Sequence, residues 1–277
     1  MTKSFKGVWI PKWGEMILII VLFILGVVCS SLIAGILMNL GVGQDLLMLL
    51  TYPLMFLFVF IYFCIRNASS KVYRTELSVP VGRENRSLWL LVAILTFAAS
   101  FVMDAVNEAM PPMPEWLMQA LSSATGGNFI INFLSVAVLA PLLEEWLCRG
   151  LIMRTLYRNG VKAFWAIVLS ALFFALIHGN PWQAVPAFAL GCLFGYVYYK
   201  TGNLWLCILM HFTNNFTSLM ISQIEEVPDT ATWFSIMPQG CYWVLFVVFI
   251  LTLILGVSQI SRFDVMNSQD ISTPSQG

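Results

Sequence analysis

Apolar side chains dominate the chain in long runs that are separated by short polar stretches. A run of about 20 apolar residues is the length that an α-helix needs to cross the hydrocarbon core of a membrane. The pattern predicts eight such helices, at residues 16–38, 46–65, 88–103, 129–157, 163–178, 183–199, 204–221 and 241–257. The expected fold class is therefore all-α, a polytopic membrane protein built as a bundle of about eight transmembrane helices.

Basic residues fall on one side of this arrangement. Lys and Arg near the ends of membrane spans are retained on the cytoplasmic side. With an inside N-terminus, every loop Lys and Arg shares that side: Lys3, Lys6, Lys12, Arg66, Lys71, Arg74, Arg83, Arg86, Arg154, Arg158, Lys162, Lys200 and Arg262. The opposite loops carry only acidic charges. This asymmetry predicts that both termini are cytoplasmic.

Composition supports the membrane assignment and limits the classes of partner that the protein is expected to bind. The chain is 59% hydrophobic and 10% charged, whereas a soluble domain carries about 25% charged residues. Its formal net charge of zero gives no attraction to nucleic acid, so membrane lipid and a membrane-associated protein or peptide substrate are the expected partners. The six cysteines include no C-x-x-C pair, which argues against a disulfide framework and a thiolate zinc site.

The spans divide the chain into five parts. Residues 1–15 are expected to be a cytoplasmic interfacial segment, with Trp9 and Trp13 at the membrane interface. Residues 16–128 hold the N-terminal transmembrane helices, 129–221 the core with the candidate chemistry, 222–260 an outer loop and the last helix, and 261–277 a disordered cytoplasmic tail. Residues 110–121 predict a short surface helix after their prolines. Short loops and the lack of a K-D-E-L-type signal favour a bacterial cytoplasmic membrane.

Few ionisable or imidazole side chains lie within the predicted spans. Such residues usually face a bundle interior or a water-filled cavity. The candidate site residues are Glu144, Glu145, Arg149, His178 and His211, with Asn215 one helical turn after His211. One residue alone would be explained by a hydrogen bond between helices. The whole set, on successive spans and including both histidines of the chain, predicts a functional site.

Spacing separates the two glutamates. Glu145 and Arg149 stand at i and i+4 on one helix face and are expected to pair. Glu144 is rotated by about 100° and can point to another part of the bundle, which makes it the better candidate for a general base. Hairpin turns at 158–161 and 201–203 would bring His178 to a similar depth and His211 somewhat nearer the cytoplasm.

Three short motifs follow one another along these spans. They are E-E-x-x-x-R at 144–149, F-x-x-x-H at 174–178 and H-x-x-x-N at 211–215. In this order they resemble the CPBP family, the CAAX-processing and bacteriocin-processing intramembrane endopeptidases that include the Ras-converting enzyme. The resemblance implies hydrolysis of a peptide bond inside the membrane, in CAAX-type or leader-peptide processing. It implies that Glu144 activates a water, that His178 holds the water or a metal, and that His211 and Asn215 hold the oxyanion.

Other interpretations remain open at this point. Glu144, His178 and His211 could instead be ligands of zinc, since two histidines and one carboxylate suit that metal, although no H-E-x-x-H helix is present. A non-catalytic bacteriocin-immunity or scaffold relative would keep the same fold. A proton-coupled transporter would also bury charges, but would more often show internal repeats. The G-x-x-x-G at Gly191 and Gly195 is expected to serve close helix packing.

Overall fold

The computed structural model describes residues 9–69, 86–125, 127–223 and 232–263. Every regular element in these residues is a helix, which confirms the all-α fold class. Most of the predicted cytoplasmic tail and of the interfacial segment lies outside the described residues.

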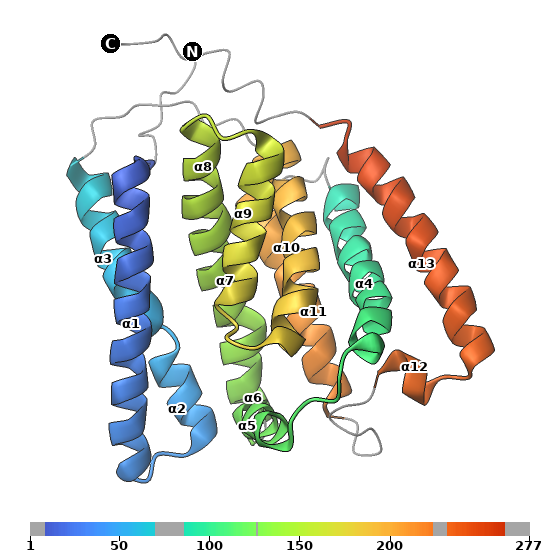
Figure 1. The fold of residues 1–277 in the computed structure, drawn as a ribbon, viewed down its shortest axis with the longest axis horizontal. Coiled ribbons are helices and arrows are strands. Elements are labelled where there is room, and N and C mark those ends of the chain that lie inside the picture. The colour runs from blue at the N-terminus through green and yellow to red at the C-terminus, as the bar shows by residue number, and fades with distance from the viewer. Residues whose placement is uncertain (1–8, 70–85, 126, 224–231, 264–277) are drawn as a thin grey trace.

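The long helices stand side by side and alternate in direction (Figure 1). They are α1 (Trp13–Asn39), α3 (Leu54–Ser69), α4 (Arg86–Ala109), α9 (Ala163–Leu176), α10 (Pro181–Thr201), α11 (Leu204–Ile221) and α13 (Gln239–Ile260). Shorter helices α2 (Gln44–Thr51), α5 (Glu115–Thr125) and α12 (Trp233–Ile236) connect them. The helix predicted within 110–121 is confirmed as α5. In Figure 1 the start of α1 and the end of α13 lie at the same end of the molecule.

Within the described residues, six helical segments are long and apolar enough to cross a membrane. They are Trp13–Asn39, Leu46–Ser69, Arg86–Ala109, Phe129–Arg158, Leu204–Ile221 and Gln239–Ile260. Large apolar side chains on their outer faces are exposed, as a lipid-facing surface requires: Leu32 is 64% exposed and Leu255 65%. The protein is a multi-pass integral membrane protein. The other two predicted spans correspond to α9, which has only 14 residues, and to the less apolar α10, so the count of eight stays a prediction.

The second predicted span, 46–65, corresponds to the candidate span Leu46–Ser69 and is interrupted within it. Helix α2 ends at Thr51 and α3 begins at Leu54, with Tyr52 and Pro53 between them. Proline has no backbone N–H and its ring clashes with the preceding helical turn, so the ladder of hydrogen bonds is interrupted there. The break leaves Tyr52 where α2 meets α3.

The fourth predicted span forms one helical run with two widened stretches. The segments α6 (Phe129–Asn132), η2 (Phe133–Leu139), α7 (Ala140–Glu145), η3 (Trp146–Met153) and α8 (Arg154–Arg158) follow without a gap, and η2 and η3 are π-helical. Wide turns of this kind are rare and occur frequently at functional sites. Glu144 and Glu145 end α7, between the two π-helical stretches.

Glycines on α10 allow the close approach of α9. A β-carbon on Gly191 would lie 3.1 Å from Ala171 Cβ, and one on Gly195 would lie 3.2 Å from Ile167 Cγ2. The close helix packing predicted for the G-x-x-x-G is therefore present.

The first described residues pack against protein rather than lipid. Trp9 is only 7% exposed, its backbone N–H donates to Asn67 Oδ1 at 3.1 Å, and the Arg66 guanidinium lies over its ring at 5.5 Å. Trp13 is 46% exposed, as an interfacial residue would be. The Trp9 ring thus anchors the segment to α3, and its place at the membrane interface stays a prediction.

Reporter fusions test the predicted orientation. Fusions within the segment 66–87 and at the C-terminus are expected to report cytoplasm, whereas a fusion at Glu115 is expected to report the outside. The reason is the one-sided distribution of loop Lys and Arg, and α5 lies at the end of the molecule opposite the start of α1 (Figure 1). Paired alkaline phosphatase and fluorescent protein reporters measure this. Opposite signals at two of the three positions would contradict the orientation.

Candidate functional site

A fully buried ion pair forms the base of the site. Arg149 Nη1 lies 2.9 Å from Glu145 Oε1, and both side chains are 0% exposed. The second guanidinium nitrogen, Nη2, donates to the backbone carbonyl of Gly191 at 2.8 Å. The guanidinium also lies 4.8 Å from the centre of the Phe174 ring, close enough for a cation–π contact. The ion pair predicted from the spacing is present and is locked to α9 and α10.

His211 is oriented by the same carboxylate. Its Nδ1 lies 3.0 Å from Glu145 Oε1. An ionised carboxylate only accepts hydrogen bonds, so Nδ1 carries the hydrogen in this contact. The ring rests edge-on against Phe174, with centroids 5.2 Å apart. These contacts leave Nε2 as the nitrogen that faces Glu144.

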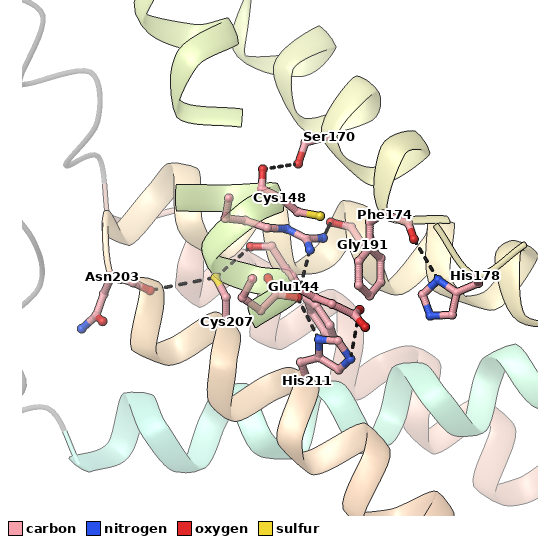
Figure 2. Close-up of polar contacts among 12 residues, drawn as sticks. Glu144, Cys148, Ser170, Phe174, His178, Gly191, Asn203, Cys207 and His211 are labelled. Atoms are coloured by element: carbon pink, nitrogen blue, oxygen red, sulfur yellow. Dashed lines mark hydrogen bonds and ion pairs between the residues drawn. The ribbon is translucent and has the colours of Figure 1, made fainter. Parts of the chain in front are cut away.

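Glu144 is 7% exposed and faces the other nitrogen of the His211 ring. Its Oε1 accepts a hydrogen bond from the hydroxyl of Tyr52. Its Oε2 is buried without a hydrogen-bond partner among the described residues and lies 4.0 Å from His211 Nε2. That separation is too long for a direct hydrogen bond and suits a shared water. Figure 2 shows Glu144 and His211 turned toward each other.

His178 joins the site through Phe174. Its Nδ1 lies 2.8 Å from the backbone carbonyl of Phe174. A carbonyl only accepts, so Nδ1 carries the hydrogen, and a neutral ring then has its lone pair on Nε2. The Phe174 ring contacts the rings of both histidines. Figure 2 shows His178 set apart from His211.

Asn215 is held by the π-helical segment η2 and not by the other candidate residues. Its Nδ2 donates to the carbonyl of Val136 at 2.9 Å, and its Oδ1 accepts from Asn214 Nδ2 at 3.1 Å. Asn214 Oδ1 in turn accepts from the Ser100 hydroxyl at 2.7 Å. This series of hydrogen bonds connects α11 to α4 and to η2.

The proposed zinc ligands do not form a ligand set as they are placed. Within the described ranges, no group of three His, Cys, Asp or Glu side chains gathers closely enough to hold a metal ion. Glu144 and His211 face each other, whereas His178 Nδ1 lies against the backbone carbonyl of Phe174.

Sequence reasoning missed two partners of the site. Tyr52 reaches Glu144 from 92 residues away in the chain, and its signal was the proline that follows it inside an apolar run. Gly191 supplies a carbonyl to Arg149, and a β-carbon there would lie 3.1 Å from Arg149 Nη2. The G-x-x-x-G indicated close packing but not this contact.

The comparisons with known proteins agree with the motifs. Residues 126–217 match the family model described as type II CAAX prenyl endopeptidase Rce1-like. The chain is 30% identical over 91 residues to the Bacillus subtilis (strain 168) protein named "Putative membrane peptidase YdiL", a match that covers 33% of this chain and 36% of that protein. The chain thus spans about a third of the length of this relative. No solved structure matches it. All three motifs lie within the matched residues, so residues 126–217 are similar to the Rce1-like membrane endopeptidases.

Proposed function

We propose that the protein is an intramembrane endopeptidase that hydrolyses a peptide bond of a membrane-associated protein or peptide with a water activated by Glu144. The observation that carries the proposal is the pair of facing atoms, Glu144 Oε2 and His211 Nε2, at 4.0 Å. Oε2 is buried and has no hydrogen-bond partner in the part of the chain that the structure describes, although buried polar atoms are almost always paired. A water between these atoms would satisfy both.

The reaction then follows from the placement of acceptors. Glu144 Oε2 takes a proton from the water as the water oxygen bonds to the carbonyl carbon of the substrate. The carbonyl π electrons move to oxygen and give a tetrahedral oxyanion. When that oxyanion collapses, the C–N bond breaks and Glu144 returns the proton to the leaving amine. Glu144 ends the cycle ionised, and one water has been consumed.

Glu145 and Arg149 prepare His211 for this reaction. The guanidinium compensates the buried charge of Glu145, and Glu145 holds the hydrogen of His211 on Nδ1. Nε2 therefore faces the reacting water, and a protonated ring would donate from Nε2 to the oxyanion. Because the partners are fixed before substrate binds, little reorganisation is needed during the reaction.

His178 and Asn215 have supporting roles in the proposal. The Nε2 of a neutral His178 offers a lone pair that can hold a water or a substrate N–H, since its Nδ1 is bonded to Phe174. Asn215 Nδ2 has two hydrogens and gives one to Val136, which leaves one donor for the oxyanion. The substrate class, a prenylated C-terminus or a leader peptide, is carried over from the family.

Purified protein in lipid vesicles, given a panel of fluorogenic peptides, tests the function. The panel contains a prenylated C-terminal peptide, its unprenylated counterpart and a hydrophobic leader-type peptide, with products identified by mass spectrometry. At least one peptide is expected to be cut at a single bond, and activity is expected to survive exhaustive chelation. One equivalent of bound zinc that is lost in both His178→Ala and His211→Ala would instead support the metal-ligand alternative. Absence of cleavage across the panel would contradict the proposal for these substrate classes.

A further inference from the structure

Tyr52 contacts the proposed general base directly, although no motif contains it. Its hydroxyl donates to Glu144 Oε1 across 92 positions of sequence. Its ring packs beside Phe56, with centroids 5.7 Å apart. Glu144 thus faces two polar side chains, His211 and Tyr52. Tyr52 comes from the second membrane segment.

The hydrogen bond fixes the direction of the Glu144 carboxylate. The last torsion of a glutamate side chain is broad, so the plane of the carboxylate can rotate when nothing holds it. A phenol has one hydrogen to donate, and here that hydrogen is on Oε1. Oε2 is therefore the oxygen that stays turned toward His211 Nε2.

Tyr52 is itself held in place by the helix break. Met55 N–H donates to the carbonyl of Tyr52 at 3.2 Å, in an i to i+3 bond. It therefore does not make the usual α-helical bond to the carbonyl of Thr51. The hydroxyl of Ser30 on α1 donates to that Thr51 carbonyl at 2.7 Å, and both Ser30 and Thr51 are buried. The break is therefore pinned to α1, and this fixes the residue that follows Thr51. A site residue works best when such supporting contacts lock its position.

We propose that Tyr52 is a positioning residue for the reaction, which holds the Glu144 carboxylate so that Oε2 faces the attacking water. The inference rests on the proposed function of Glu144. It adds a residue from the N-terminal part of the chain, outside the family-matched residues 126–217, to the machinery of the core. The N-terminal helices then take part in catalysis and do not serve only as membrane anchors.

The variant Tyr52→Phe tests this inference, because it keeps the ring and removes only the donor. We expect kcat to fall by about 10- to 100-fold, because a hydrogen bond to a charged group is worth about that factor, with KM unchanged. Tyr62→Phe is the matched control, since Tyr62 lies on α3 and packs edge-on against Trp9 at 5.6 Å. That control is expected to keep the wild-type kcat. A kcat for Tyr52→Phe within twofold of wild type would overturn the inference.

A second measurement separates the failure of this inference from the failure of the proposed function. A double-mutant cycle of Tyr52→Phe and Glu144→Ala, read from unfolding in detergent, tests the contact without any substrate. Non-additive effects are expected, and additive effects would overturn the contact and the inference with it. If the cycle is non-additive but wild type cleaves no peptide, the proposed function fails, and Tyr52 is only a structural partner of Glu144. If wild type cleaves and Tyr52→Phe cleaves equally well, only the positioning role fails.

Discussion

Glu144→Gln is expected to abolish hydrolysis and to leave the protein folded. Glutamine has nearly the same shape and can still accept the Tyr52 hydrogen bond through its amide oxygen, but it cannot take a proton from water at neutral pH. Loss of a general base costs about 10²- to 10⁴-fold in rate. The initial rate of cleavage of a verified substrate measures the effect, and the unfolding temperature in detergent checks the fold.

Glu115→Gln is the matched control, because Glu115 is exposed in the first turn of α5 and lies outside the site. It is expected to keep the wild-type rate. Full activity of Glu144→Gln would contradict both the water-activation and the zinc-ligand versions of the site. The buried charges would then be explained by transport or by packing.

Alanine variants of His178, His211 and Asn215 compare how much each side chain contributes to the cleavage rate. His178→Ala and His211→Ala are expected to be inactive. Asn215→Ala is expected to keep part of the activity, because loss of a single oxyanion donor costs about 10²- to 10³-fold in other hydrolases. The same cleavage assay measures all three. If Asn215→Ala is as inactive as His211→Ala, Asn215 contributes more to the reaction than one hydrogen bond to the oxyanion.

Arg149→Ala is expected to lose stability as well as activity. The substitution leaves the fully buried carboxylate of Glu145 without its counter-charge, and breaking a buried pair in this way costs about 3 to 5 kcal/mol. It also removes the donor to the Gly191 carbonyl, which joins Arg149 to α10. Denaturant unfolding in detergent measures the loss, together with the cleavage rate.

Arg66→Ala is the comparison for this prediction. Arg66 pairs with Glu15 at a site where its side chain is 42% exposed, and exposed ion pairs contribute about 0 to 1 kcal/mol. Its loss of stability is expected to be much smaller than that of Arg149→Ala. Unchanged unfolding of Arg149→Ala with lost activity would show that Arg149 acts in the reaction and does not hold the fold.

Local signals in the sequence predicted much of the helical fold and part of the site. Apolar runs gave the positions of the long helices, because the length needed to cross a membrane is set by the bilayer. The i, i+4 spacing gave the pair of Glu145 and Arg149, because both ends of that contact lie on one helix. The same geometry predicted that Glu144 would not share the contact with Arg149, and Glu144 instead accepts from Tyr52.

Contacts between distant segments could not be predicted in the same way. The bond from Tyr52 to Glu144 and the chain from Ser100 through Asn214 depend on how helices pack in three dimensions. Pro53 is visible in the sequence, but the helix break beside it could not be predicted. Many membrane helices tolerate proline when neighbouring groups satisfy the freed backbone groups. The π-helical segments had no recognised sequence signal. The packing of Trp9 on α3 is another contact of this kind.

The two π-helical segments on either side of Glu144 have a consequence for insertions and deletions. A π-helical turn holds an extra residue compared with an α-helical turn, so removing one residue from η2 can restore an α-helix without shortening its neighbours. The residues before η2 would then keep nearly the same direction relative to Glu144, because the wide turn had absorbed the extra residue, and Glu145, Arg149 and His211 would keep their register. A deletion between Glu145 and Arg149 would instead break the buried ion pair. Relatives of this chain should therefore differ in length by single residues within 133–139, and should keep the spacing from Glu144 to Arg149 fixed.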